Sequence, residues 1–354
     1  MSILLLCILI VASFLTIRII RLTPPAITGI HISGNQLINS KDETIVPHGV
    51  NRSGTEYMCV HGDGFFDGPS DAASVNAMAS WHINTVRIPL NEDCWLSLNG
   101  VPEAYSGPAY QKAITDYVHL LNSKNIIAIL DLHWSAPGLN LATKQLAMAD
   151  ADHSPQFWSS VASTFKNNSS VLFDLYNEPY VTTWTCWLQG STAPSTAPCE
   201  KIDFAVAGMQ SLVNAVRDAG AHNVLIASGL GYAGYLVEWN NNKPQDPDNN
   251  LMASFHAYNF IQCADLKCMQ KNIEPILATT PVIIGELGEN DCQHGYINKT
   301  MDWLDQMHVG YLGWSWNVAN CQKFPALISN YDGTATGFGA GLKQHFSDLA
   351  SNPF

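Results

Sequence analysis

The chain has 354 residues, of which 47% are hydrophobic and only 13% are charged. This composition provides for a large hydrophobic core and argues against a disordered protein. The formal net charge is -13, from 17 Lys and Arg against 30 Asp and Glu, and the basic residues form no cluster. An acidic chain of this kind repels nucleic-acid phosphates, so we expect no nucleic-acid partner.

The N-terminal segment is almost continuously apolar from Ile3 to Leu15 and is followed by Arg18 and Arg21. A secretory signal normally carries its positive charges before the apolar run, and two arginines near the end make a poor membrane span. Three interpretations stay open: a signal peptide, an N-terminal membrane anchor, or a start site assigned too late. We expect export, with residues 1–22 as signal peptide or anchor and residues 23–354 as one folded domain.

Eight cysteines lie outside this segment, and an even number favours a disulfide framework in an oxidising compartment. Paired in chain order they would close four local loops, Cys59–Cys94, Cys186–Cys199, Cys263–Cys268 and Cys292–Cys321. Eight cysteines allow roughly a hundred connectivities, so this order is a hypothesis, and free buried thiols are the alternative. The sequence has no CxxC and no HxH or HxxxH pair, so we expect no metal site.

Eight apolar runs of strand length recur along the chain. They lie at 44–51, 83–90, 126–134, 171–178, 223–230, 251–258, 281–288 and 310–317. Runs this continuously apolar are typical of parallel strands that are buried on both faces of a sheet.

A helical pattern follows each apolar run. We expect helices at 70–82, 109–123, from 154 onward, 201–219, and near 233–239, 267–278, 295–308 and 338–350. Ser70 is expected to cap the first helix, and Ser154 followed by Pro155 to cap the third. The fourth helix has an apolar face that includes Ile202 and Val216.

Eight β/α units predict a single (β/α)8 barrel of the TIM type, an α/β fold. The stretch 29–39 predicts a short N-terminal hairpin with its turn at Gly34–Asn35, which could cap the bottom of the barrel. The Ser/Thr/Pro-rich loop 184–200 is expected to be closed by Cys186 and Cys199. We therefore expect one barrel with an N-terminal hairpin and disulfide-stapled loops.

Polar and aromatic side chains end most of the predicted strands. These are Arg87, His133, Glu178, His256, Tyr258, Glu286, Trp314 and Trp316. Because the active sites of such barrels lie at the carboxyl ends of the strands, we expect these side chains to meet. Two carboxylates among Arg, His, Tyr and Trp suit glycoside hydrolysis, in which one protonates the leaving oxygen and the other attacks the anomeric carbon.

The motifs LYNEP at the end of the fourth run and IIGELG on the seventh resemble glycoside hydrolase family 5, the cellulase A family. The resemblance covers nearly the whole chain after the N-terminal segment. It implies a retaining endo-β-glycanase without a cofactor, with Glu178 as acid/base and Glu286 as nucleophile. β-1,4-Glucan is the substrate we expect, while β-1,4-mannan, xyloglucan and mixed-linkage glucan stay open because the loops decide among them.

The same resemblance assigns supporting roles to the other strand-end residues. It implies that Asn177 binds the sugar 2-hydroxyl, and that the nucleophile is held ionised and aligned by two residues, Arg87 and Tyr258. His133 and His256 would line the cleft. Trp314 would form the sugar platform. Retention predicts that the two carboxyl groups lie about 5–5.5 Å apart.

Two residues and two other classes of barrel protein offer alternative interpretations. Glu289 is a rival nucleophile three residues after Glu286, and Trp316 could pack in the core. A metal-dependent barrel would need a ligand cluster that Asp174 and the histidines do not make, and an inactive sugar-binding barrel would lack one carboxylate. We expect a secreted monomer that acts on a polysaccharide, or a membrane-anchored one with the catalytic domain outside.

Overall fold

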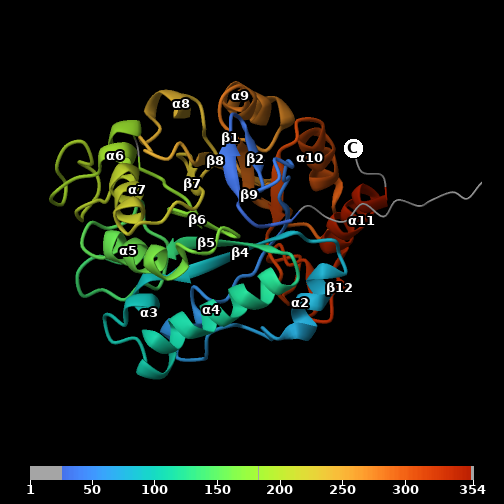
Figure 1. Ribbon diagram of the computed structural model, residues 1–354, viewed down its shortest axis with the longest axis horizontal. Coiled ribbons are helices and arrows are strands. Elements are labelled where there is room, and N and C mark those ends of the chain that lie inside the picture. Colours follow the sequence, from blue (N-terminus) through green and yellow to red (C-terminus); the bar gives the residue numbers. More distant parts are fainter. Residues whose placement is uncertain (1–25, 182, 352–354) are drawn as a thin grey trace, which may run out of the picture.

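The computed structural model describes residues 26–181 and 183–351, so the predicted leader 1–22 lies outside the described residues (Figure 1). Eight parallel strands close into a barrel in the order β10-β3-β4-β5-β6-β7-β8-β9. They are β3 (His48–Asn51), β4 (Thr85–Asn91), β5 (Ile127–Trp134), β6 (Val171–Asp174), β7 (Leu225–Ser228), β8 (Leu251–Tyr258), β9 (Val282–Gly288) and β10 (Gly310–Gly313). Each predicted run coincides with one barrel strand, and only β4 extends past its run, by one residue, which confirms the predicted fold.

Helices surround the strands (Figure 1). They are α1 (Met58–His61), α2 (Ala72–Ala79), α3 (Glu92–Leu96), η1 (Glu103–Tyr105), α4 (Pro108–Ser123), α5 (Ser154–Phe165), α6 (Trp184–Gln189), α7 (Met209–Asp218), α8 (Trp239–Asn242), α9 (Leu266–Leu277), α10 (Gly295–Gln306) and α11 (Gly337–Ser351). A small antiparallel pair, β11 (Ile328–Asn330) and β12 (Thr334–Ala335), precedes α11. Among the described residues, no helix is long and apolar enough to cross a membrane.

The predicted helix 201–219 is wrong in its first half. The helix begins only at Met209, because Val206 forms an isolated bridge with Asp150 and Ala207 forms another with Gly190. These bridges tie the segment to neighbouring loops, and tertiary pairing overrides the helical pattern. The helix expected near 233–239 is likewise wrong, since only the short α8 forms there.

Two predicted helix caps are also wrong. Asp71, not Ser70, caps α2, and its carboxylate accepts a hydrogen bond from the backbone N–H of Ser74 at 2.9 Å. Ser154 is the first residue of α5, and its hydroxyl contacts two buried carboxylates, Glu92 and Asp150.

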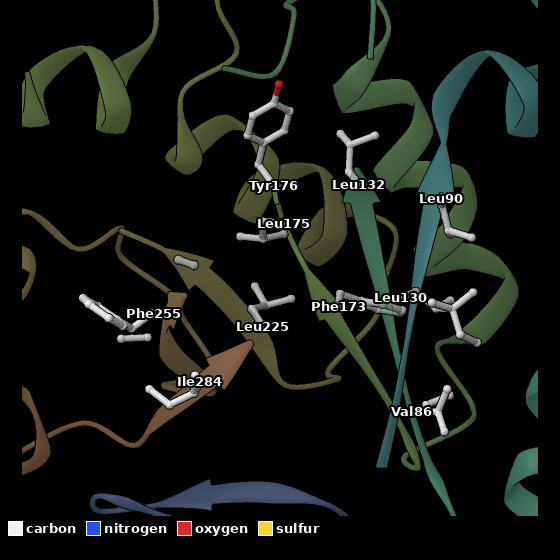
Figure 2. Close-up of a cluster of buried hydrophobic side chains, with 14 of the residues drawn as sticks. Val86, Leu90, Leu130, Leu132, Phe173, Leu175, Tyr176, Leu225, Phe255 and Ile284 are labelled. Atoms are coloured by element: carbon white, nitrogen blue, oxygen red, sulfur yellow. The ribbon is translucent and has the colours of Figure 1, made fainter. Parts of the chain in front are cut away.

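The outward-facing side chains of the barrel strands form a continuous apolar layer beneath the helices. Figure 2 shows part of it, where Leu130, Phe173 and Leu225 come from three neighbouring strands, β5, β6 and β7. Alternate residues on the same strands therefore point into the barrel.

The N-terminal hairpin closes one end of that interior. Its strands β1 (His31–Ser33) and β2 (Gln36–Ile38) are antiparallel, and Gly34 takes a positive φ of 61° in the turn. Leu37 belongs to an apolar cluster that also contains Leu172 and Met252 near the beginnings of their strands. This confirms the predicted cap at the bottom of the barrel and leaves the polar groups at the other end.

Four disulfides form as the chain-order hypothesis predicted, Cys59–Cys94, Cys186–Cys199, Cys263–Cys268 and Cys292–Cys321. All eight cysteines lie in segments that follow the carboxyl end of a barrel strand. The cross-links therefore tie down the loops at the end of the barrel where its polar residues gather.

Candidate active site

A single buried arginine organises the carboxyl end of the barrel. Arg87 on β4 donates from Nε to Asp174 Oδ2 at 2.8 Å. Its Nη1 donates to Asn51 Oδ1 and to Glu286 Oε1, both at 3.0 Å. Its Nη2 donates to Asn177 Oδ1 at 2.8 Å and lies 3.0 Å from Asp131 Oδ2. A guanidinium has five N–H donors, and here Arg87 makes four hydrogen bonds and an additional ion pair with Asp131. The arginine thus fixes residues from β3, β5, β6 and β9 in one arrangement.

Three carboxylates surround this one cation, and burial shifts the pKa of two of them, Asp131 and Asp174. Burial raises the pKa of Asp131 to about 7 and that of Asp174 to about 8, although the charge of Arg87 opposes both shifts. Burial disfavours the charged form of Arg87 as well, but the carboxylates outweigh it and raise its pKa. The arginine therefore stays charged, while the two aspartates carry less negative charge than their sequence suggests.

A β-bulge aims Glu286 into the barrel. On β9, Ile284 pairs with Phe255 but Glu286 pairs with His256, so Gly285 is the extra residue. Without it, strict alternation would turn the Glu286 side chain outward. A Cβ on Gly285 would lie 2.6 Å from Ser254 Oγ and 2.9 Å from His256 Nε2, so any larger residue would displace these two side chains.

Hydrogen-bond donors surround the Glu286 carboxylate. Tyr258 donates its hydroxyl to Oε2 at 2.5 Å, and Arg87 donates to Oε1. His256 Nδ1 lies 3.5 Å from Oε2. Proximity to this carboxylate and burial raise the pKa of Tyr258, with burial the larger cause, so the phenol keeps its proton and remains a donor.

Glu178 lies across from this group, after β6, in a different environment. Its side chain is 19% exposed, and Oε1 lies 2.9 Å from His256 Nδ1. Within residues 26–181 and 183–351, no Lys or Arg forms an ion pair with it, and burial raises the pKa of Glu178. One oxygen of Glu178, one oxygen of Glu286 and a nitrogen of His256 all lie within 4.8 Å of one another.

His133 and Trp314 form a second wall. Their rings stack with centroids 5.5 Å apart and an interplanar angle of 10°, and His133 Nδ1 lies 2.6 Å from Asp131 Oδ2. Burial lowers the pKa of His133 to about 4 and that of His256 to about 3. Both imidazoles are therefore neutral near neutral pH and can exchange hydrogen bonds with a neutral ligand.

The structure thus brings together all eight predicted site residues. They are Arg87, His133, Asn177, Glu178, His256, Tyr258, Glu286 and Trp314. The two rival residues lie elsewhere in the packing. Glu289 accepts hydrogen bonds from the backbone N–H groups of Tyr296 and Ile297 at 3.1 Å, at the start of α10, and Trp316 packs fully buried against Trp81.

The sequence indicates Asn51, at the end of the first predicted strand, as a residue that could shape the cleft, and in the structure it donates to the carbonyl of Gly285 at 2.9 Å. Sequence reasoning missed two residues of this site. Asp131 precedes His133 by two positions on β5, so strand alternation could have placed it in the interior. Gln145 lies in a loop without a periodic pattern, and the sequence carries no signal for it.

A cavity of about 750 Å³ adjoins this site between the loops that follow β5 and β6. Its lining includes Gln145, Tyr180, Lys201, Asp203 and Phe204. Gln145 also contacts Glu178, so the cavity and the carboxylate pair share a wall. A cavity of this volume is within the range of pockets that bind a drug-sized ligand.

Comparisons with known proteins identify the family of the chain. A family model described as cellulase (glycosyl hydrolase family 5) matches residues 47–320. The chain therefore belongs to glycoside hydrolase family 5 and is a glycoside hydrolase of this endo-glycanase family.

Two curated relatives differ in their named activities. The chain is 22% identical over 310 residues to a mannan endo-1,4-beta-mannosidase from Streptomyces lividans, covering 82% of this chain and 66% of that protein. It is 22% identical over 287 residues to the cellulase CelDZ1 from Thermoanaerobacterium sp, covering 77% and 67%. The chain spans about two thirds of the length of each.

Solved structures share the fold. The β-glucanase SdGluc5_26A from Saccharophagus degradans matches with a TM-score of 0.68 and 19% identity, covering 91% of this chain and 93% of that one. A second structure of that enzyme is a complex with cellotetraose. A β-mannanase from Streptomyces thermolilacinus matches with a TM-score of 0.62 and 21% identity, covering 91% and 98%.

Proposed function

We propose that this chain is a retaining endo-glycanase that hydrolyses β-1,4-glucan by double displacement with Glu178 and Glu286. The observation that carries the proposal is that an oxygen of each carboxylate lies within 4.8 Å of the other. Retaining glycosidases place their carboxyl groups about 5–5.5 Å apart, whereas inverting enzymes need about 6.5–9.5 Å to admit a water molecule. The short separation supports direct attack by one carboxylate.

The environments of the two glutamates support their roles. Glu286 receives hydrogen bonds from Arg87 and Tyr258, which stabilise a negative charge and suit the nucleophile. Glu178 has a raised pKa and suits the acid. Glu178 donates its proton to the glycosidic oxygen while Glu286 bonds to the anomeric carbon. Glu178 then takes a proton from the water that attacks this carbon, and Glu286 leaves as a carboxylate.

The remaining residues would hold the sugar over this pair. Asn177 presents an amide N–H, which we assign to the sugar 2-hydroxyl. The neutral rings of His133 and His256 offer hydrogen bonds beside the reacting carbon. The indole of Trp314 provides the flat apolar face on which a sugar ring stacks.

The choice of glucan rests on the relatives. CelDZ1 is named a cellulase, and SdGluc5_26A, which has a similar fold, has a crystal structure in complex with cellotetraose. The named mannosidase from Streptomyces lividans supports β-1,4-mannan as the second candidate. Double displacement by two glutamates serves both substrates, because glucose and mannose differ only in the configuration of the 2-hydroxyl and not at the anomeric carbon that reacts.

We also propose that the protein is exported and acts as a monomer, with residues 23–354 as the catalytic domain. Four disulfides support an oxidising compartment. The apolar run before residue 22 supports a signal peptide or a membrane anchor. N-terminal sequencing of protein recovered from medium and from membranes separates these fates, and light scattering gives the oligomeric state.

The test is reducing-sugar release by the full chain on a panel of soluble cellulose, mixed-linkage glucan, xyloglucan, glucomannan, galactomannan and xylan. We expect the highest rate on soluble cellulose and a rapid fall in viscosity, which marks endo cleavage. A preference for galactomannan would replace glucan by mannan. Silence on every polymer, with folded protein and intact disulfides, would refute the proposed activity.

A further inference from the structure

Gln145 contacts two consecutive site residues at once, Asn177 and Glu178, although it lies outside the segment after β6 that carries them. It lies in the segment 135–153 between β5 and α5. Its Oε1 accepts a hydrogen bond from Asn177 Nδ2 at 2.6 Å. Its Nε2 donates to the backbone carbonyl of Glu178 at 2.8 Å. One carboxamide thus holds a side chain and the main chain of consecutive residues.

The orientation of each amide in this chain follows from Arg87. A guanidinium can only donate, so the oxygen of Asn177 must face Arg87 and its nitrogen must face away. That nitrogen requires an acceptor, which is Oε1 of Gln145. The nitrogen of Gln145 then faces the carbonyl of Glu178, which can only accept. The result is a continuous hydrogen-bond path from Gln145 through Asn177 and Arg87 to Glu286.

This path leaves one N–H of Asn177 free to point elsewhere. Asn177 has two donors on Nδ2, and Gln145 takes one of them. Because the amide is planar and both of its ends are held, the direction of the second N–H is fixed. This is the N–H that the proposed function assigns to the sugar 2-hydroxyl.

The segment that carries Gln145 is itself held on both sides. The backbone N–H of Ala142 donates to buried Asp93 Oδ2 at 2.8 Å. On the other side, Tyr176 donates its hydroxyl to the carbonyl of Leu146 at 2.9 Å. Gln145 therefore does not depend on its own two hydrogen bonds for its place, and it can act as a fixed reference for Asn177.

We propose that Gln145 is a positioning residue that fixes the amide plane of Asn177 against Arg87 and so presents one N–H to the glycoside. This inference rests on the proposed hydrolase function and extends it to a residue outside the barrel strands. The amide of Gln145 also lies close enough to the Glu178 carboxyl to oppose the rise in the pKa of that group that burial causes, but Gln145 is assigned no bond to the sugar. A direct contact with a sugar in the adjoining cavity is the competing role.

The first test compares Gln145→Met with wild type on an aryl cellobioside. Methionine has nearly the volume of glutamine but makes neither hydrogen bond, so the packing is kept. We expect kcat/KM to fall by roughly tenfold or more, mainly through kcat. Leu139→Ala is the matched control, because Leu139 lies in the same segment with 93% of its surface exposed. It is expected to behave as wild type.

A double-mutant cycle then separates positioning from a general loss of order. If Gln145 acts through Asn177, Gln145→Met changes kcat/KM by no more than about twofold in the Asn177→Ala background. Multiplying effects in the double variant would overturn the proposal. So would a loss confined to KM on long oligosaccharides, which would indicate a direct sugar contact in the cavity.

Gln145→Glu provides a second, independent readout. Glutamate can still accept from Asn177, but it turns a second acceptor and a negative charge toward Glu178. The alkaline limb of the pH profile, which reports loss of the proton from Glu178, is expected to move to higher pH. An unmoved limb together with wild-type rates in both Gln145 variants would refute the positioning role.

The outcomes also separate this inference from the proposed function. Wild-type protein that fails to cleave any aryl glycoside or polymer refutes the hydrolase proposal and the inference with it. Active wild type with unaffected Gln145 variants refutes the inference alone. Thermal unfolding of each variant accompanies the assays, and a variant that does not fold is replaced in the cycle by the other one.

Discussion

Two clusters of buried carboxylates, one at the carboxyl ends of the barrel strands and one in the segments that follow β4 and β5, differ in charge balance and in exposure. The cleft cluster consists of Arg87, Asp131, Asp174, Glu178, His256 and Glu286. The loop cluster consists of Glu92, Asp93, Asp150, His153 and Ser154. Each contains a group of three side chains close enough to bind one ion, Glu178, His256 and Glu286 in the first and Glu92, Asp150 and His153 in the second. Composition alone would rank the two equally.

In the loop cluster, the carboxylates find their hydrogen-bond partners in the cluster itself and in the neighbouring backbone. Glu92 accepts from the backbone N–H of Ala136 at 2.8 Å and contacts the Ser154 hydroxyl at 2.7 Å, while that hydroxyl also lies 3.0 Å from Asp150. A hydroxyl has one hydrogen for two carboxylates, so one of them must itself carry a proton. Burial raises the pKa of Glu92 well above its usual value, with Asp150 adding to the shift.

The cleft cluster has a permanent cation at its centre and one carboxylate that reaches solvent. Arg87 stabilises charge on Glu286, whereas no Lys or Arg forms an ion pair with the loop cluster within the described ranges. Glu178 is partly exposed, and the loop cluster is buried except for His153. The feature that distinguishes the candidate active site is therefore a carboxylate held by fixed hydrogen-bond donors, Glu286, beside a solvent-accessible carboxyl group, Glu178. The number of carboxylates does not distinguish the two clusters.

The largest expected effect comes from Glu286→Gln, which removes the proposed nucleophile while keeping its shape. Turnover should fall by about 10⁴-fold or more, because an amide cannot form the covalent intermediate, while sugar binding persists. Reducing-sugar release and binding calorimetry measure the two. The matched control is Glu289→Gln, which should lose about 1 kcal/mol of stability as a weakened helix cap and keep its turnover. Equal losses in both variants would refute the assignment.

Glu178→Ala should have the next largest effect. Loss of the proton donor is expected to reduce polymer hydrolysis by about 10²- to 10⁴-fold. Aryl glycosides with good leaving groups should be cleaved far better than polymer, because their leaving oxygen needs little protonation. Added azide should restore part of the rate by attacking the covalent intermediate. Wild-type behaviour on polymer would show that another group supplies the proton.

Glu92→Gln applies the same isosteric change to the loop cluster, and activity should stay within about threefold of wild type. The pKa of Glu92 is raised from 4.5 on folding, so its proton adds stability that is complete below 4.5 and is lost as the pH rises. Glutamine supplies a permanent N–H in place of that proton. The variant should therefore gain stability relative to wild type at pH 8 and little at pH 4, measured by chemical denaturation. A drop in turnover comparable with that of Glu286→Gln would show that the loop cluster also takes part in catalysis.

Asp174→Asn should have the smallest effect on catalysis. Burial raises the pKa of Asp174 from 3.8 to about 8, so the side chain carries a proton at pH 6 and asparagine leaves the charge unchanged. Its oxygen can still accept from Arg87. We expect kcat within about threefold of wild type at pH 6 and a flatter loss of stability between pH 4 and pH 8. A hundredfold loss of kcat would mean that Arg87 needs a charged partner at this position.

The strands of this barrel could be predicted because they are buried on both faces, and the strand-end residues followed from the barrel geometry. The start of α7 could not, because a bridge between Val206 and Asp150 competes with the helical pattern. The inward direction of the Glu286 side chain depends on the bulge at Gly285, and the alternating pattern of the strand does not predict this bulge. Gln145 could not be found at all, since its partners lie more than thirty residues further along the chain and its own loop has no repeating pattern.

The central claim is that Glu286 forms a covalent bond to the sugar. The most direct test incubates the protein with a cellobiosyl fluoride whose 2-hydroxyl is replaced by fluorine, followed by mass spectrometry of the intact and digested protein. Fluorine at that position slows the second step, so the glycosyl intermediate accumulates. The account predicts one added disaccharide per chain, located on Glu286. A label on Glu178 or Glu289, or an unlabelled enzyme whose natural product has inverted configuration, would contradict it.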